Sequence, residues 1–164
     1  MSQVSEHASV KRVKDYLAQN NLEVEIKHLT DTARTAVDAA TALGVEVGQI
    51  ASSIVFSIPE PILIITSGKH RVDTSFVEQV TGIPKLGRAD ADFVRTWSGF
   101  AIGGVSPVGW LNENEIFQPK TFIDNALAEY GEIWAAAGHT HVVFKTNFSD
   151  LMKISKAKQI EVEK

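Results

Sequence analysis

The apolar positions change their spacing along the chain, and each spacing predicts a different element. Val10, Val13 and Leu17 recur every three or four residues, which is the period of an amphipathic helix. Val24 and Ile26 alternate with charged residues, as in a half-buried strand. The chain is therefore expected to begin with a helix followed by a strand.

Two continuous apolar runs predict the centre of a sheet. They span residues 53–58 and 62–66, and the segment Pro59-Glu60-Pro61 between them is typical of a hairpin connection. Because both runs are apolar with little alternation, we expect two central strands that are covered on both faces. Shorter strands are predicted at residues 100–102, 121–123 and 142–144.

Side chains that can cap a helix mark where further helices are expected to begin. Thr35, with Asp38 three residues later, resembles a capping box in front of an alanine-rich helix that ends at Gly44. Other candidate helix starts are Asp73 or Thr74, Asp90 and Ser149. The charged tail, residues 156–164, is expected to be solvated.

The order of these elements is irregular and contains no internal repeat. It favours a mixed α/β (α+β) domain with a curved, partly antiparallel sheet over a doubly wound Rossmann fold. The length of 164 residues fits one compact domain. We therefore assign residues 1–164 to a single domain with its core at residues 10–155.

The composition excludes several kinds of chemistry. The chain has no cysteine, which excludes disulfides, thiolate nucleophiles and cysteine-based zinc sites. Its net charge of −4 argues against a protein that coats long DNA or RNA, but it allows a local basic patch at one RNA end. The N-terminus lacks the pattern of a signal peptide, and no apolar stretch is long enough to span a bilayer. These features predict a cytoplasmic protein without membrane attachment.

The glycine-rich segment of residues 102–109 is the strongest candidate for a functional loop. Gly103 and Gly104 let the backbone adopt positive φ and approach a ligand, and Pro107 fixes the following turn. Successive N–H groups aimed at one point can bind an anion or an oxyanion. An ordinary turn explains the same pattern equally well.

Ser106 lies inside this loop and invites comparison with serine hydrolases. The sequence around it is Gly-Val-Ser-Pro-Val-Gly, which is not G-x-S-x-G, and Pro107 blocks the strand-to-helix elbow of that motif. We therefore interpret Ser106 as a polar wall residue or a hydroxyl that stabilises a turn.

The remaining polar candidates are interpreted as residues that stabilise the structure through hydrogen bonds. His139 and His141 would share one face of a strand, but they have no third ligand, so no metal is expected and His139 is interpreted as a hydrogen-bond partner of loop backbone. Asp124 can cap a helix at residues 125–127 or accept hydrogen bonds from the glycine loop, and a role as general base ranks below both. Nucleotide-binding fingerprints are absent, so no cofactor is expected.

Basic side chains could form a local phosphate-binding patch. Residues 67–73 resemble a turn that leads into a helix, for which a solvated loop is the simpler interpretation. The candidate cations are Lys69 and Arg71, together with Lys11, Arg12, Lys14 and Arg34.

Several segments taken in order resemble a known family. They are Thr35-Ala36 with the helix up to Leu43-Gly44-Val45, residues 49–56, residues 67–73, residues 103–109, Ile123-Asp124 and Ala137-Gly138-His139. This series is similar to the YbaK/ProX family of aminoacyl-tRNA deacylases, relatives of the editing domain inserted in bacterial prolyl-tRNA synthetase. The resemblance runs from about Val10 to Ile154, and the glycine loop is its most specific part.

The resemblance implies a fold, a reaction and a set of site residues. The fold is a compact α/β (α+β) domain with a mixed, largely antiparallel sheet wrapped by helices. The reaction is hydrolysis, in trans, of the ester that joins a wrong, small amino acid to the acceptor end of a tRNA, with neither DNA nor a membrane as partner. The family's G-x-x-x-P loop corresponds to Gly103, Gly104, Val105, Ser106 and Pro107, whose backbone amides hold the substrate carbonyl and position water. Substrate binding falls to Thr35, Ser52, Ser53, Asp124 and His139, and tRNA binding to Lys69 and Arg71.

One position departs from the family pattern. The family has a lysine in the motif Gln-x-x-Lys-Ser/Thr, and Ser52 stands in its place. A serine supplies neither the charge nor the reach of lysine. Three interpretations stay open: a subgroup that uses Lys69, Arg71 or His139 instead, a different aminoacyl group, or a non-catalytic module that binds tRNA or a synthetase. A small-molecule ester or amide hydrolase on the same scaffold is a further alternative.

Overall fold

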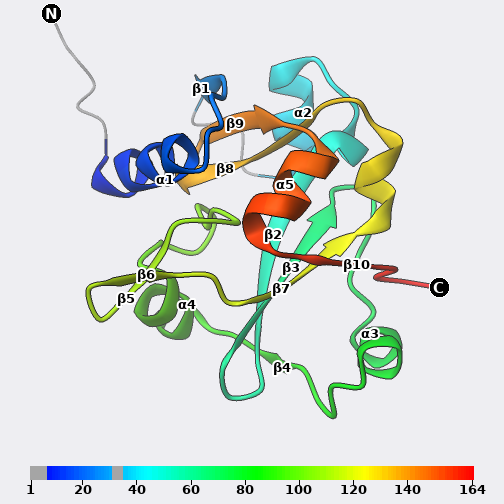
Figure 1. Ribbon diagram of the computed structural model, residues 1–164. Coiled ribbons are helices and arrows are strands. Elements are labelled where there is room, and N and C mark those ends of the chain that lie inside the picture. Colours follow the sequence, from blue (N-terminus) through cyan, green and yellow to red (C-terminus); the bar gives the residue numbers. More distant parts are fainter. Residues whose placement is uncertain (1–6, 31–34) are drawn as a thin grey trace, which may run out of the picture.

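One mixed sheet organises the computed structural model, which describes residues 7–30 and 35–164 (Figure 1). Its strands are β1 (Ile26–His28), β2 (Ile50–Ser57), β3 (Pro61–Ser67), β4 (Gly87–Arg88), β7 (Lys120–Asp124), β8 (Ile133–His139), β9 (Val142–Thr146) and β10 (Lys158–Ile160). The spatial order is β1-β9-β8-β2-β3-β7-β10, and β4 pairs with β2 beside this path. The pairs β2–β8, β3–β7 and β7–β10 are parallel, and the others are antiparallel. The predicted mixed α/β architecture is confirmed.

Five α-helices and a small hairpin complete the described part of the chain. They are α1 (Ala8–Gln19), α2 (Ala36–Leu43), α3 (Thr74–Thr81), α4 (Ala91–Ser98) and α5 (Phe148–Ser155), two short 3₁₀ helices, η1 (Val47–Gln49) and η2 (Asn125–Glu129), and the hairpin of β5 (Trp110–Asn112) and β6 (Glu115–Phe117). Figure 1 places α1 beside β8 and β9, and α3 near the opposite end of the sheet. No described helix has the length and apolar character needed to cross a bilayer.

The predicted caps explain where several helices begin. The side chains of Thr35, Asp73 and Asp90 each accept a hydrogen bond from a backbone N–H of the first turn of the helix that follows. In α5 the capping residue is Asn147, not Ser149 as predicted, because the Asn147 side chain accepts from the N–H of Asp150.

The main core lies between the sheet and two helices. Val10, Val13 and Leu17 of α1 join Leu151 and Ile154 of α5 in one cluster of buried side chains. Strand β3 is buried along its whole length, as expected of a central strand. Strand β2 differs, because the side chain of Ile54 is 38% exposed. The prediction that both strands are covered on both faces is therefore wrong for β2.

Two predicted elements differ from the structure. Residues 100–102 form no strand: Gly99 ends α4 with a φ of 75°, and Gly103 turns the chain again with a φ of 93°, so there is no room for an extended pair. The tail is not simply solvated, because β10 pairs with β7 and Val162 is buried in a second apolar cluster. The many charged residues of the tail hid these apolar contacts from the sequence prediction.

The two histidines do not share a strand face. His139 ends β8, and His141 lies in the turn before β9 with a φ of 69°. A left-handed turn residue breaks the alternation on which the prediction depended. In addition, the described residues contain no group of three or more metal-binding side chains.

Candidate functional site

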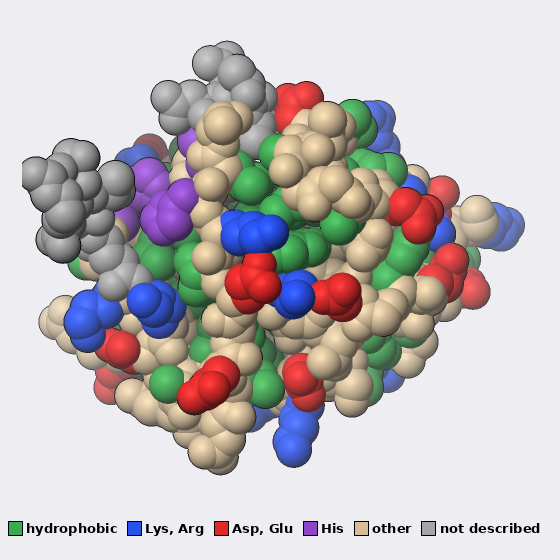
Figure 2. Space-filling model, turned by 90° about the horizontal axis from the view of Figure 1, so that it is seen from above, with side chains coloured by type: hydrophobic (Ala, Val, Ile, Leu, Met, Phe, Trp, Pro, Cys, Tyr) green, Lys and Arg blue, Asp and Glu red, His purple; other side chains and the backbone are tan. Residues whose placement is uncertain are grey.

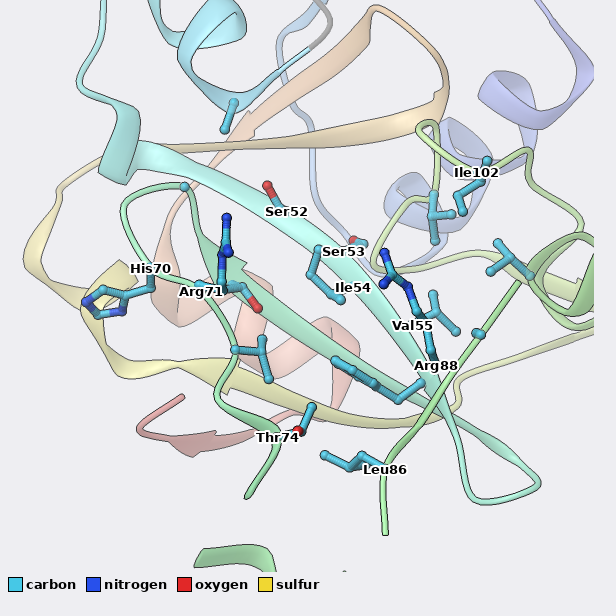
Figure 3. A pocket seen from close by; sticks show the side chains of 18 of the residues that line it. Ser52, Ser53, Ile54, Val55, His70, Arg71, Thr74, Leu86, Arg88 and Ile102 are labelled. Atoms are coloured by element: carbon cyan, nitrogen blue, oxygen red, sulfur yellow. The ribbon is translucent and has the colours of Figure 1, made fainter. Parts of the chain in front are cut away.

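A cavity of about 890 Å³ lies over β2 and is the candidate site (Figure 3). Its walls come from β2, the turn after β3, β4 and the glycine loop. A smaller cavity of about 300 Å³ adjoins it on the side of β8 and α2. The residues that line both cavities are Ala36, Ser52, Ser53, Ile54, Ile102, Gly103 and Val105. The glycine loop therefore stands at the junction of the two cavities.

The two glycines of the loop have different reasons to be glycine. Gly103 has a φ of 93° and open space where a side chain would begin. Gly104 is buried, and a Cβ there would lie 2.7 Å from the carbonyl carbon of His139 and 2.7 Å from the nitrogen of Thr140. Gly104 thus allows the loop to pack directly on the β8–β9 turn, and Gly103 allows the chain to reverse above it.

Two backbone N–H groups of the loop have no acceptor within the described part of the protein. The N–H of Gly104 donates to the carbonyl of Ala101 at 3.0 Å. In residues 7–30 and 35–164, the N–H groups of Gly103 and Val105 donate to no protein acceptor. Since both residues line the cavity, these donors can serve a ligand oxygen.

Ser106 faces away from the cavity. It is completely buried, its Oγ accepts from the N–H of Val108 at 3.1 Å, and its carbonyl accepts from Nε1 of Trp110 at 2.8 Å. Pro107, also buried, accepts through its carbonyl from the side chain of Gln118. These two residues hold the turn behind the loop, so the hydroxyl is a turn hydroxyl and not a cavity wall.

Arg12 of α1 links the end of α4 to the end of the glycine loop. Its Nε donates to the carbonyl of Gly109 at 2.8 Å, and its Nη2 donates to the carbonyl of Ser98 at 3.3 Å. The guanidinium also lies 4.6 Å from the ring centre of Phe100, and its burial lowers the Arg12 pKa. Arg12, predicted as part of a phosphate patch, therefore stabilises the loop through hydrogen bonds to its backbone and to the end of α4.

Asp124 organises the other wall. It is fully buried, and its carboxylate accepts from the N–H groups of Ser67 at 3.0 Å and Ala126 at 2.9 Å, with Nδ1 of His70 at 2.9 Å. The capping role at η2 is confirmed. The alternative, a bond to the glycine loop, is wrong, because the carboxylate holds the turn after β3 instead.

The predicted cations separate in space. Nζ of Lys69 pairs with Glu129 at 3.0 Å, and this hydrogen bond raises the Lys69 pKa. Lys11 pairs with Asp15, and Arg34 lies outside the described residues. Among the members of the predicted set that the structure describes, only Arg71 lines the larger cavity.

Arg88 was missed at the sequence level and also lines the larger cavity. In Figure 3 it projects beside β2 on the side opposite Arg71. It sits in a strand of two residues, so no periodic signal pointed to it. No acidic residue occurs among the described residues that line this cavity. Figure 2 shows acidic and basic side chains interspersed over one outer face, so the cavity differs in charge from that surface.

The other predicted substrate-binding residues line one or both cavities. Ser52 and Ser53 lie in β2, and the Oγ of Ser53 is shielded from solvent without a hydrogen-bond partner among the described residues. Thr35 and His139 line the smaller cavity. The Thr35 hydroxyl caps α2, and Nδ1 of His139 contacts the carbonyl of Thr140 at 3.0 Å, as expected for a histidine bound to loop backbone.

Replacing the Ser106 hydroxyl tests whether it has a chemical role. We expect Ser106→Ala to lower the free energy of unfolding by about 1 kcal/mol, because one buried hydrogen bond is removed. Any activity of the site should stay within about threefold, since the hydroxyl faces the protein interior. Denaturant unfolding and single-turnover assays measure the two quantities. Ser155→Ala, which removes an equally buried hydroxyl in α5, is the matched control.

That expectation has a clear contrary outcome. A hundredfold loss of activity in Ser106→Ala, at unchanged stability and with Ser155→Ala unaffected, would assign Ser106 to the chemistry.

The sequence that forms this site is similar to known proteins. The profile of the aminoacyl-tRNA editing domain matches residues 30–154. The uncharacterized protein YwhH of Bacillus subtilis (strain 168) is 26% identical over 152 residues, which cover 92% of this chain and 93% of that protein.

Solved structures show the same fold. The crystal structure of "a putative trans-editing enzyme for prolyl tRNA synthetase" is 33% identical with a TM-score of 0.87, and the match covers 98% of this chain and 99% of the other. The hypothetical protein APE2540 is 20% identical with a TM-score of 0.79, over 93% of this chain and 99% of that one. The second likeness concerns the fold alone.

Proposed function

Because this chain belongs to the aminoacyl-tRNA editing domain family, we propose that it hydrolyses, in trans, the ester of a tRNA that carries a wrong, small amino acid. The observation that carries the proposal is the glycine loop at the junction of two cavities, with the N–H groups of Gly103 and Val105 unpaired in the described structure. The relative named for prolyl-tRNA synthetase makes proline tRNA the first partner to test.

The proposed reaction uses backbone rather than a side-chain nucleophile. Water adds to the ester carbonyl carbon, and negative charge develops on the carbonyl oxygen. The N–H groups of Gly103 and Val105 stabilise that charge as an oxyanion hole. The bond to the ribose oxygen then breaks, and the products are the free amino acid and the tRNA with its hydroxyl restored. One fixed donor of this kind contributes about 10²–10³ in rate.

The terminal ribose of the tRNA supplies the remaining polar group. Its free hydroxyl, next to the ester, is placed to orient the attacking water, as in the family that the sequence resembles. This chain has no cysteine, and Ser106 is buried in the turn of the loop. The hydroxyls of Ser52 and Ser53 line the cavity, but no basic side chain is hydrogen-bonded to either among the described residues, so neither is activated as a nucleophile. Hydrolysis by a positioned water is therefore the reaction that these residues support best.

The two cavities suit the two parts of the substrate. The larger one carries Arg71 and Arg88 and no described acidic side chain, so it suits the phosphate-bearing end of the tRNA. The smaller one, about 300 Å³, is lined by Ala39, Ala135 and Ala136 among others, and it suits the amino-acid side chain. A hydrolytic pocket of limited size serves as a second sieve where a synthetase discriminates one methylene by only about 1–3 kcal/mol.

Ser52 replaces the family lysine within this arrangement. Its side chain lines both cavities, and Arg71 lines the larger one with it (Figure 3). Arg71, with Arg88 in the same cavity, is therefore a described cation that can take over the charge of the missing lysine. This supports the interpretation of an active subgroup with a different contact over that of a protein that only binds.

Single-turnover deacylation across a panel of mischarged tRNAs distinguishes the candidate functions. An active editing enzyme hydrolyses one or more small aminoacyl esters faster than the uncatalysed rate. A binding module binds tRNA at low salt without turnover, whereas a general esterase hydrolyses simple esters without preference for tRNA. Rates equal to the uncatalysed ester for every pair would contradict the proposed function.

Removing either arginine is expected to weaken tRNA binding. With Arg71→Gln or Arg88→Gln, we expect lower affinity and a shallower salt dependence of log K, by about 0.7 for each phosphate that is no longer neutralised, the value for single strands. Arg95→Gln is the matched control, because Arg95 is exposed on α4 outside the cavity lining. Binding titrations at several salt concentrations measure this. Identical salt slopes in all four proteins would rule out a phosphate contact at these arginines.

A further inference from the structure

The two edges of β2 are not equally paired. In an antiparallel pair, alternate residues direct their N–H and C=O groups toward the partner strand. Gly68 donates to the carbonyl of Ile50, and Ile58 donates to the carbonyl of Glu60, so the even-numbered residues of β2 face β3. The backbone groups of Ser53 and Val55 therefore point to the opposite edge.

That opposite edge is open over a short stretch. Strand β8 pairs with β2 only at Ile50 and Ala51, and β4 pairs with it only at Phe56 and Ser57. Between these pairs, no described strand covers residues 52–55. Four residues span roughly 13 Å of strand.

The open stretch has one unpaired backbone acceptor and one unpaired backbone donor on the same strand edge. The carbonyl of Ser53 and the N–H of Val55 have no hydrogen-bond partner in the described structure, and they lie two residues apart on the same edge. The buried Ser53 Oγ beside them is also unpaired among the described residues. Both residues line the larger cavity. Ser53 and Val55 are partly buried, and an unpaired strand edge that opens into a cavity can bind a ligand with a complementary donor and acceptor.

We propose that this open edge binds the adenine of the substrate's terminal nucleoside. The N6 amino group of adenine donates to the Ser53 carbonyl, and N1 accepts from the Val55 N–H. Unpaired bases are commonly read on this Watson–Crick edge. The proposal rests on the proposed function, because every tRNA ends in adenosine.

The surroundings favour a nucleotide over a peptide. Both ends of the open stretch are closed by β8 and β4, so an added peptide strand has room for few pairs. Val55, Leu86 and Ile102 give the cavity apolar walls for the flat faces of a base. Arg71 and Arg88 provide cations within the same cavity for the attached phosphate.

Adenosine 5′-monophosphate and three analogues test this directly in ¹⁵N-edited NMR titrations of the whole chain. The 1-deaza analogue lacks the N1 acceptor, the purine riboside analogue lacks the N6 amino group, and the 7-deaza analogue keeps both and is the control. We expect roughly tenfold weaker binding for each of the first two and a change within twofold for the control. The amide signals of Ser53 and Val55 should shift with the parent nucleotide.

Each contrary result would overturn the assignment. These are no saturable shift of the Ser53 and Val55 amides with the parent nucleotide, equal affinity for all four nucleotides, or weakening confined to the 7-deaza analogue. A short peptide amide that shifts these two signals when the nucleotide does not would assign the edge to peptides instead. Because binding is measured without turnover, a failure of deacylation leaves this test intact, and active deacylation with a negative titration would reject the adenine site alone.

Discussion

Substituting Gly104 with valine (Gly104→Val) is expected to reduce kcat/KM at least about a hundredfold. The added Cβ would lie 2.7 Å from two backbone atoms of His139 and Thr140, which cannot rotate away as a side chain tip could. The loop must therefore move off the β8–β9 turn, and its N–H groups move with it. A displacement of about 1 Å at a catalytic group costs on the order of 10² in rate. Single-turnover deacylation with the best substrate of the panel measures the reduction.

Substitutions at two other glycines distinguish the effect of close packing at Gly104 from a general loss of stability. Gly131→Ala meets no atom within 4 Å and should leave activity unchanged. Gly103→Ala also meets no atom, but a φ of 93° strains any other residue by about 1–3 kcal/mol, so we expect an intermediate reduction in activity. Full activity in a folded Gly104→Val protein would mean that the close packing of the loop on the turn has no part in the reaction.

Replacing Asp124 with alanine should give the largest loss of stability. The substitution leaves the N–H groups of Ser67 and Ala126 without their acceptor in a fully buried place. Since each of the two unsatisfied buried groups costs about 1–3 kcal/mol, we expect the free energy of unfolding to fall by roughly 2–6 kcal/mol. Denaturant unfolding measures this change.

A second variant isolates the backbone hydrogen bonds of Asp124. His70→Ala removes only the partly exposed histidine, leaves both backbone hydrogen bonds of the carboxylate in place, and should cost about 1 kcal/mol. Because Asp124 also fixes the turn that carries Arg71, we expect weaker tRNA binding in any Asp124→Ala protein that still folds. Equal stability losses in the two variants would show that the histidine, and not the backbone hydrogen bonds, carries the effect.

Local signals in the sequence were sufficient for much of the fold. Thr35, Asp73 and Asp90 cap the helices that follow them, because a cap depends only on residues within one turn. The apolar run at residues 62–66 correctly predicted the central strand β3, because the burial of a strand on both faces is visible in its own residues. Residues 100–102 failed as a strand because both neighbouring glycines adopt positive φ, which composition does not reveal.

The site was predictable only where it is carried by one continuous segment. The glycine loop is such a segment. Arg88 and the open edge at Ser53 arise from where β8 and β4 stop pairing with β2, and this depends on strands far apart in the chain. The same limitation explains Asp124, whose partners Ser67 and His70 lie 57 and 54 residues away. The sequence spacing allowed Asp124 either to cap the next helix or to bind the glycine loop, and it did not distinguish the two.

Ser52, which stands in place of the family lysine, lies where both cavities meet. From the sequence, Ser52 raised the question of whether the protein is still active. In the structure, Ser52 lines both cavities beside a loop with unpaired N–H groups, and Arg71 and Arg88 supply positive charge to the larger one. These features are the reason why we propose a changed contact with the tRNA end rather than a loss of activity.

The proposed deacylase activity is tested by the single-turnover rate of ester hydrolysis for proline tRNA charged with a small wrong amino acid, such as alanine. With the wild-type chain in excess, we expect a rate well above that of the uncatalysed ester, and a rate reduced at least about a hundredfold in Gly104→Val. If that pair and every other pair in the panel decayed at the uncatalysed rate with the wild-type chain, the central claim of an editing deacylase would be contradicted.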